Sequence, residues 1–265
     1  MLRLAGHGRE PACASLMNLT DKVALVTGGT RGIGAAGALA LAREGAQVAI
    51  SARRDDAQAR ATLAALRDLG RRAEFIAADY GRPADATRAV EDTLRQFGRL
   101  DVVVHAAGGP VNGGLLEITP EQWESAFAVH VHAAFHLCRA AVPHLRAQRE
   151  GAIVLISSTA GLRGIVTNIA YQTAKGALPQ FTRALAREFA PDNIRVNCLA
   201  PGVVRTDFHA TMTEAQRRLN LEQRIPLRRE GTPEQVASLL LEVVKNDYLT
   251  GETFTIDGGL TMRIA

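Results

Sequence analysis

The sequence predicts a single α/β domain in which helices cover both faces of one parallel β-sheet. Short apolar runs alternate with longer helical stretches along the whole chain, which is the pattern of a doubly wound fold. The length of 265 residues lies within the range of one hydrophobic core. Hydrophobic residues make up 47% of the chain and aromatic residues only 5%, and small aliphatic side chains let helices pack closely on a buried sheet. We therefore expect one domain over residues 17–265.

The first expected strand, residues 23–27, passes at once into a glycine-rich turn and an alanine-rich helical stretch. A strand, a glycine turn and a helix in this order form the context of a dinucleotide-binding loop. Gly28 would permit the tight turn, Gly32 would let backbone N–H groups approach a pyrophosphate, and Gly34 would let the helix pack on the strand. The helix N-terminus adds positive potential for the phosphates. An ordinary strand-to-helix turn is the alternative, but it does not need three glycines at this spacing.

The end of the second strand, residues 47–51, bears on the choice of cofactor. A free ribose 2′-hydroxyl is usually held here by a carboxylate, and none is present. Arg53, helped by Arg31 of the glycine loop, offers a cation for a 2′-phosphate, which predicts NADP(H) rather than NAD(H). Alternatively, Arg53 is an exposed arginine at a helix start whose charge Asp55 and Asp56 neutralise.

The remaining chain repeats this alternation without an internal repeat, a low-complexity segment or a linker between domains. We expect six or seven strands in one sheet, and seven in the complete domain. The later elements are predicted, in order, as a strand at 47–51, a helix at 55–69, a strand at 73–78, a helix at 83–97, a strand at 101–105, a helix from Thr119, a strand at 152–156, a helix around Tyr171 to residue 189, a strand at 193–199, a helix at 233–245 and a strand at 253–256.

Two of these strands end in residues that suit a bound nucleotide. Asp79 closes the strand at 73–78, where its carboxylate could accept from an adenine amino group or could cap the following helix. The strand at 101–105 runs into the small residues at 106–108. Such residues are expected where a chain passes close to a nucleotide at the carboxyl ends of a sheet.

Tyr171 and Lys175 are the best candidates for chemistry. Residues four apart share one helix face, so both side chains can point at one reacting atom. A phenol with a pKa of about 10 is a poor catalyst at neutral pH, but a fixed ammonium nearby would lower that pKa. Ser158, at the end of the preceding strand, could donate to the same substrate oxygen. The alternative is a half-buried Tyr171 with a solvated hydroxyl. Pro179, four residues after Lys175, should remove one helical hydrogen bond and bend the helix.

Composition argues against several other classes. The formal charge is +4 and the pI about 9.3, but no basic run is interleaved with aromatic residues, so we expect no nucleic-acid binding. No apolar run reaches the ~18 residues of a membrane span. Cys13, Cys138 and Cys198 lie far apart with no metal-ligand grouping, which predicts a reduced, cytoplasmic protein without a metal. Residues 1–16 are expected to be a disordered leader, or to follow an upstream start codon with Met17 as the beginning.

From Leu19 to Gly259 the chain resembles the short-chain dehydrogenase/reductase family, in its subtype of roughly 250 residues with a Rossmann-type fold. The glycine loop from Thr27 matches the family's TGxxxGxG, and the stretches at 201–206 and 257–259 match its PGxxxT and DGG. Ser158, Tyr171 and Lys175 match its catalytic positions. The resemblance implies a cofactor site formed by Gly28, Thr30, Arg31, Gly32, Ile33, Gly34, Arg53, Asp79, Tyr80, Ala106, Ala107, Gly108, Tyr171, Lys175, Pro201, Gly202, Val204 and Thr206.

The chain departs from the family at two places. The family's NNAG is replaced by a sequence that begins with His105, so both asparagines are lost. The family's fourth catalytic residue, an asparagine that maintains a helix irregularity and a water-linked proton relay to the lysine, aligns with His130. His130 could keep the irregularity, could join the relay, or could be a packed residue that faces the core.

The resemblance implies an NADP(H)-dependent oxidoreductase that interconverts a ketone and a secondary alcohol by hydride transfer, with Tyr171 as general acid or base. The chain is most similar to 3-oxoacyl-thioester reductases. A sugar or steroid alcohol dehydrogenase, or a non-catalytic NADP(H)-binding sensor, are the alternatives. Residues 203–230, which carry apolar side chains among arginines, should form a mobile lid over the substrate. The helices around Phe127 and Phe181 are the family's usual assembly surface, so we expect a homotetramer.

Overall fold

A computed structural model describes residues 16–210 and 212–262, and it contains the predicted seven-stranded parallel sheet. The strand order is β3-β2-β1-β4-β5-β6-β7, and every neighbouring pair is parallel. The strands are β1 (Val23–Thr27), β2 (Gln47–Ala52), β3 (Ala73–Ala77), β4 (Val102–His105), β5 (Gly151–Ile156), β6 (Ile194–Pro201) and β7 (Thr253–Ile256).

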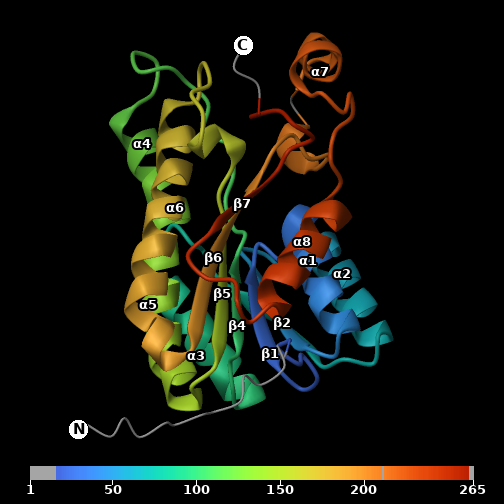
Figure 1. The fold of residues 1–265 in the computed structure, drawn as a ribbon, viewed down its shortest axis with the longest axis vertical. Coiled ribbons are helices and arrows are strands. Elements are labelled where there is room, and N and C mark those ends of the chain that lie inside the picture. Colours follow the sequence, from blue (N-terminus) through green and yellow to red (C-terminus); the bar gives the residue numbers. More distant parts are fainter. Residues whose placement is uncertain (1–15, 211, 263–265) are drawn as a thin grey trace, which may run out of the picture.

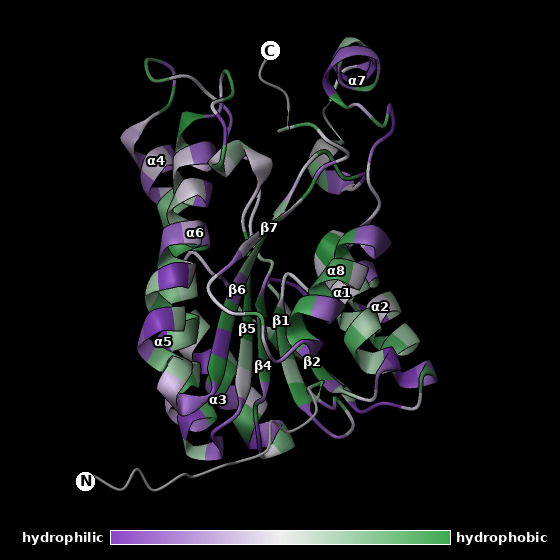
Figure 2. Cartoon of the chain, in the orientation of Figure 1, coloured by the Kyte–Doolittle hydropathy of each residue, from purple (hydrophilic) through white to green (hydrophobic). Residues whose placement is uncertain are grey.

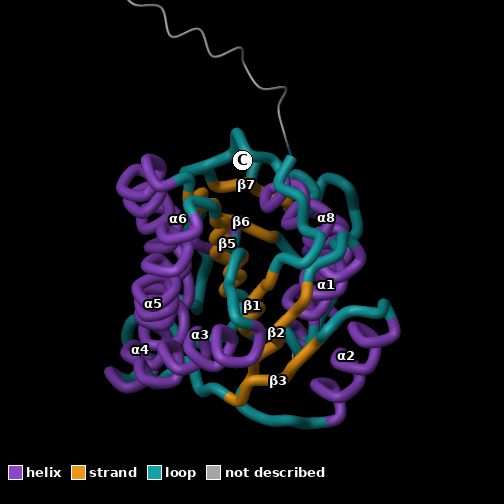
Figure 3. The backbone as a smooth tube through the Cα atoms, turned by 90° about the horizontal axis from the view of Figure 1, so that it is seen from below, coloured by secondary structure: helices purple, strands orange, loops and turns teal. Residues whose placement is uncertain are grey.

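Helices cover both faces of this sheet, as the alternation predicts (Figures 1 and 3). One buried cluster lies between the sheet and α3, α5 and α6, and a second lies between the sheet and α1, α2 and α8. Apolar residues fill the central strands, and polar residues lie mainly on the outer helix faces (Figure 2). The helices are α1 (Gly32–Arg43), α2 (Ala57–Asp68), α3 (Pro83–Phe97), α4 (Pro120–Phe127), α5 (Ala133–Gln148), α6 (Ile169–Phe189), α7 (Glu214–Leu219) and α8 (Pro233–Lys245).

The strand order reverses between β1 and β4: β2 and β3 are added on one side of β1, and β4 to β7 on the other. Thr27 and His105 are register partners at the last paired position of these strands. The connections that follow β1 and β4 therefore leave towards opposite faces of the sheet and open a crevice at its carboxyl edge.

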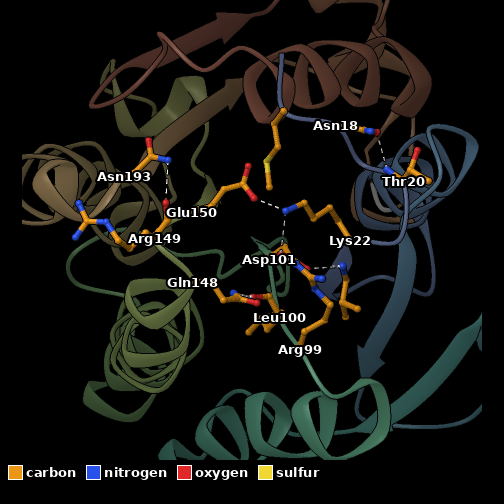
Figure 4. A network of polar contacts seen from close by, with 12 residues as sticks. Asn18, Thr20, Lys22, Arg99, Leu100, Asp101, Gln148, Arg149, Glu150 and Asn193 are labelled. Carbon is orange, nitrogen blue, oxygen red and sulfur yellow. Dashed lines mark hydrogen bonds and ion pairs between the residues drawn. The ribbon is translucent and has the colours of Figure 1, made fainter. Parts of the chain in front are cut away.

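At the amino ends of the strands, opposite the crevice, charged residues form a network around Asp101 (Figure 4). Asp101 is fully buried and accepts hydrogen bonds from the Val23 N–H at 2.9 Å and from the guanidinium of Arg99 at 2.7 and 2.8 Å. Lys22 lies 3.6 Å from the same carboxylate and also pairs with Glu150. The network joins the starts of β1, β4 and β5, so it holds the strands in register at the end far from the crevice.

Residues 1–15 of the expected leader lie outside the described residues. Met17 is buried, and its N–H donates to the Lys245 carbonyl at the end of α8. Within the described ranges, no helix combines the length and the apolar character that crossing a membrane requires.

Candidate active site

A crevice of about 770 Å³ runs along the carboxyl ends of the strands at the point where the strand order reverses. The glycine loop after β1, the ends of β2, β3 and β4, and the start of the lid all contribute to it. Of the residues predicted to hold a dinucleotide, the crevice is lined by Gly28, Thr30, Arg31, Gly32, Ile33, Gly34, Arg53, Asp79, Tyr80, Ala106, Ala107, Gly108 and Thr206. Gly202 instead lines a second cavity, Pro201 and Val204 are buried, and Tyr171 and Lys175 line neither cavity.

The glycine loop has the shape that a pyrophosphate requires. Gly28 and Gly32 have φ values of +64° and +55°, which side chains rarely adopt. A Cβ on Gly34 would lie 2.2 Å from the Gly28 carbonyl oxygen, so only glycine lets α1 start this close to the turn. The N-cap of α1, Arg31, makes no side-chain capping bond, whereas α2, α4 and α8 are all capped by a side chain. The first N–H groups of α1 are thus open to an anion.

Both cations and carboxylates line the crevice, and Arg31 lies 4.0 Å from the carboxylate of Asp207. Arg53 is exposed and lines the crevice together with Arg31. The side chain of Asp56 accepts from the Ala59 N–H and caps α2, and Asp55 lies 3.7 Å from Arg60. Neither carboxylate pairs with Arg53 within the described residues, so the alternative in which they neutralise it is not supported.

Asp79 does not cap the helix after β3, which was one of its two predicted roles. The N-cap of α3 is Arg82, and Asp79 instead accepts from the Gly81 N–H at 3.0 Å while it lines the crevice. Tyr80 is buried, and its hydroxyl donates to Ser51 at 2.7 Å. Tyr80 therefore supports the crevice floor more than it reaches into the crevice.

Tyr171 lines neither this crevice nor a second cavity of about 420 Å³, but it interacts with one residue of each. Its ring centre is 5.6 Å from that of Phe208, which lines the crevice. The side chain of Ser158, which lines the second cavity, lies close enough to the phenol to lower its pKa in part. Lys175 is buried on the same face of α6, with its Nζ 5.8 Å from the centre of the phenol ring. The three residues predicted to be catalytic are thus brought together.

The prediction that Lys175 lowers the pKa of Tyr171 is wrong for this arrangement. Burial of the phenol dominates and raises the pKa of Tyr171 to about 12, and the side chain of Ser158 lowers it only in part. The ammonium of Lys175 donates to the Ile156 carbonyl at 2.7 Å. Lys175 is itself desolvated, which lowers its pKa to about 8. At neutral pH the phenol is therefore protonated, the state that a general acid needs.

The helix that follows β4 contains a π-helical turn at Ala128–His132, between α4 and α5, and His130 lies within it. His130 is buried, and its Nε2 is 3.1 Å from the Gly109 carbonyl oxygen, which can only accept, so Nε2 carries the proton. Nδ1 is then an acceptor, and it has no partner among the described residues. The ring lies 5.5 Å from that of Tyr171, nearly perpendicular to it. A Cβ on Gly108 would lie 2.1 Å from this imidazole, so the ring occupies the space that a side chain there would fill.

His105, where the family motif has its first asparagine, joins β1, β4 and this π-helical turn. Its Nε2 lies 3.2 Å from the Val129 carbonyl oxygen, so its Nδ1 accepts from the Thr27 hydroxyl at 2.9 Å. The Thr27 oxygen in turn accepts from the Ala107 N–H at 3.0 Å. Burial lowers the pKa of His105 to about 3, and it lowers that of His130 well below the usual value, with Lys175 contributing to both. Both imidazoles are therefore neutral at physiological pH.

The second cavity lies under the predicted lid. A buried carboxylate fixes the base of the lid, because Glu230 lies 3.1 Å from Arg205 and 3.8 Å from Arg217 of α7. Apolar, polar and cationic side chains line the cavity. They are Ser158, Thr159, Ala160, Arg163, Gly164, Ile165, Gly202, Val203, Met212, Asn220, Gln223, Arg224, Leu260 and Thr261.

Sequence reasoning missed three features of the site. It assigned no contact with Tyr171 to Phe208, and it did not place Arg163 beside Ser158. It also did not detect the second π-helical turn, Asn220–Arg224, which lines the cavity. The lid arginines were a usable signal for that cavity, but a π-helical turn leaves no periodic signature in so short a segment.

Known proteins resemble this chain over most of its length. A family model described as enoyl-(acyl carrier protein) reductase matches residues 28–261. An uncharacterized oxidoreductase of Mycobacterium tuberculosis is 39% identical over 250 residues, which cover 93% of this chain and 94% of that protein. The 3-oxoacyl-[acyl-carrier-protein] reductase FabG of Chlamydia muridarum is 34% identical, with 91% and 98% covered. The crystal structure of L-sorbose reductase from Gluconobacter frateurii, complexed with NADPH and L-sorbose, superposes with a TM-score of 0.87 at 29% identity and covers 94% of this chain and 99% of that one.

Proposed function

Because the chain belongs to the short-chain dehydrogenase/reductase family, we propose that it is an NADP(H)-dependent oxidoreductase that interconverts a ketone and a secondary alcohol. One observation carries the proposal. Tyr171 packs against Phe208, which lines the crevice, and its phenol interacts with Ser158, which lines a separate cavity. A group in that position can exchange a proton with a substrate that reacts with a nucleotide held next to it.

The crevice fits NADP(H). The open N-terminus of α1 and the loop at Gly28 and Gly32 would hold the pyrophosphate, and Arg53 with Arg31 would hold the 2′-phosphate. Thr206 lines the same crevice and would hold the carboxamide group of the nicotinamide. NADPH supplies the hydride equivalent when it is bound. A solved relative with NADPH in the same fold supports this choice over NAD(H).

Ser158 and Tyr171 would act together on the substrate oxygen. The Ser158 hydroxyl would donate to the carbonyl oxygen and polarise it. Tyr171 would give that oxygen its proton, which its high pKa keeps in place at neutral pH. This state favours reduction of a ketone over oxidation of an alcohol. Lys175 would stabilise negative charge on the phenol after the transfer while its ammonium remains protonated.

We assign His130 a positioning role. Its Nε2–H holds the Gly109 carbonyl, and its ring packs between Gly108 and Tyr171, so it links the wall of the crevice to the catalytic phenol. The free Nδ1 can accept from a water or a hydroxyl group beside Tyr171. The neutral state of the ring argues against storage of a proton on His130.

Similarity to FabG makes a 3-oxoacyl thioester one candidate substrate. Similarity to L-sorbose reductase makes a sugar another candidate substrate. Buried free thiols at Cys138 and Cys198 support a reducing, cytoplasmic location. We also propose assembly into a homotetramer through α4, α5 and α6, in which the half-exposed Phe135 on α5 would be covered.

The test is the loss of NADPH absorbance with a panel of ketones, sugars and 3-oxoacyl thioesters, repeated with NADH. Turnover of at least one carbonyl compound with NADPH, and much slower turnover with NADH, is the expected result. Tight NADPH binding without any turnover would overturn the proposal in favour of a non-catalytic NADP(H) sensor.

A further inference from the structure

The cavity beside Ser158 has one polar end, an apolar section and two cations. Ser158 marks the end where the substrate carbonyl would bind, and Ile165, Val203, Met212 and Leu260 line an apolar section. Arg163, from the loop after β5, and Arg224, from the lid, line the same cavity, and its described lining contains no carboxylate. The nucleotide crevice differs, because three aspartates line it along with its three arginines.

Arg224 is held in place by an unusual backbone. It ends the π-helical turn Asn220–Arg224, in which the Ile225 N–H reaches back to the Asn220 carbonyl at 2.8 Å. Asn220 is 4% exposed, and its Oδ1 accepts from the Arg224 guanidinium at 3.0 Å while its amide donates to the Met212 sulfur at 3.6 Å. π-Helical turns are rare and are frequent at functional sites.

Among the described residues, Arg224 has no acidic partner, unlike three other arginines of the lid. Arg205 and Arg217 share the buried Glu230, and Arg218 pairs with Glu222 at 2.8 Å. Within the part of the chain that the structure describes, neither Arg224 nor Arg163 lies in an ion pair. Each donates to a neutral oxygen, Arg224 to Asn220 and Arg163 to the Leu162 carbonyl at 3.0 Å. Two cations that line a cavity without a carboxylate attract an anion.

We propose that the substrate carries an oxyanion group, a carboxylate or a phosphate, which Arg224 binds together with Arg163, and that an apolar segment separates this group from the carbonyl. The inference rests on the proposed function and narrows its substrate class. It favours oxo acids or phosphorylated acyl carriers over neutral sugars and steroids, because a neutral substrate would leave both cations without a partner.

The experiment compares short oxo carboxylates of increasing chain length with their methyl esters, and a 3-oxoacyl phosphopantetheine with the same thioester that lacks the phosphate. Each is assayed with NADPH against the wild type, Arg224→Gln, Arg163→Gln and Arg218→Gln. Arg218 lies on the exposed face of the same lid and serves as the matched control. Binding of a saturated carboxylate, which cannot react, is measured by calorimetry with the same four proteins.

We expect one anionic series to have a higher kcat/KM than its neutral partners. Arg224→Gln should lower kcat/KM for that series about 10- to 100-fold and change kcat/KM for the neutral partners little. The series whose kcat/KM depends on Arg224 identifies the oxyanion as carboxylate or phosphate. Turnover with equal preference for charged and neutral partners, unchanged in Arg224→Gln, overturns the inference and leaves the proposed function standing. If no compound is turned over, the wider panel of ketones and sugars decides the proposed function. Calorimetry then decides the inference, because it requires an oxyanion ligand to bind the wild type and the Arg218 control but not Arg224→Gln.

Discussion

The hydroxyl of Ser157 donates a hydrogen bond of 2.7 Å to the main-chain carbonyl of Lys175. That carbonyl has no helical donor, because the residue four positions on is Pro179, which lacks an N–H. Gly161 packs on the same peptide group, where a Cβ would lie 2.6 Å from the Lys175 carbonyl carbon. The residues that follow β5 therefore fix α6 at its catalytic lysine, and the helix runs unbroken from Ile169 to Phe189.

Ser157→Ala should lower the free energy of unfolding by about 1 to 3 kcal/mol, because a buried carbonyl loses its donor. In a Pro179→Ala background the cost should be smaller, since the new N–H at position 179 can donate to the Lys175 carbonyl. Urea denaturation of the two single variants and the double variant gives the coupling free energy. Strictly additive effects would show that the proline does not create the need for Ser157.

The fold was largely predictable because its signals are local and repeated. Apolar runs marked all seven strands, and the turn from Gly28 to Gly34 fixed where the first helix begins. Ser158 could be paired with Tyr171 because it ends the strand that precedes the Tyr171 helix, and the family resemblance supported that pairing.

The electrostatics of the site could not be predicted in this way. The sequence shows that a lysine follows Tyr171 by four residues, but not that burial of the phenol outweighs the influence of the ammonium. It also does not show that the imidazole of His105 reaches the Val129 carbonyl, because that contact depends on a π-helical turn. Such quantities follow from burial and backbone geometry, which single residues do not encode.

Tyr171→Phe should abolish ketone reduction, with a loss of about 100- to 10,000-fold or more, because it removes only the proton donor. Binding of NADPH should be nearly unchanged, since the ring contact with Phe208 is retained. Steady-state rates and fluorescence titration of NADPH measure the two effects separately. Retention of about a tenth of the wild-type rate would exclude Tyr171 as the general acid.

The rate of reduction should fall as the pH rises through about 8, where Lys175 loses its charge, while Tyr171 remains protonated up to about 12. No decline near pH 6.5 is expected from His105 or His130, because both are neutral there. A profile of kcat/KM against pH tests this, and a level profile to pH 10 would contradict it.

The same lysine gives a prediction for stability. Its pKa is about 8 in the folded chain and 10.5 in the reference state, so between these values the unfolded chain binds more protons. The contribution of Lys175 to stability should therefore increase as the pH rises from 8 to 10.5. Urea denaturation at pH 7 and pH 9.5 should show that the free energy of unfolding of the wild type increases relative to that of Lys175→Met. An equal change in both proteins would mean that the lysine titrates normally.

Arg53→Ala should raise the KM for NADPH about tenfold or more and change the KM for NADH little, because only NADPH carries the 2′-phosphate that the guanidinium would bind. Arg60→Ala is the matched control, since Arg60 is exposed on α2 and lies 3.7 Å from Asp55, away from the crevice lining. Equal effects of Arg53→Ala on both cofactors would assign Arg53 to the general surface charge.

His130→Phe should weaken NADPH binding and lower kcat together, because phenylalanine fills the space of the imidazole but cannot donate to the Gly109 carbonyl. His130→Gln can place an amide N–H near the position of Nε2 and should retain most of both. The loss of one buried hydrogen bond predicts a difference of about 3- to 10-fold in the Kd for NADPH between these variants. Fluorescence titration and kcat measured side by side test the assignment. If His130 serves only as packing, phenylalanine should be tolerated at least as well as glutamine, since the cavity then needs volume and not a donor.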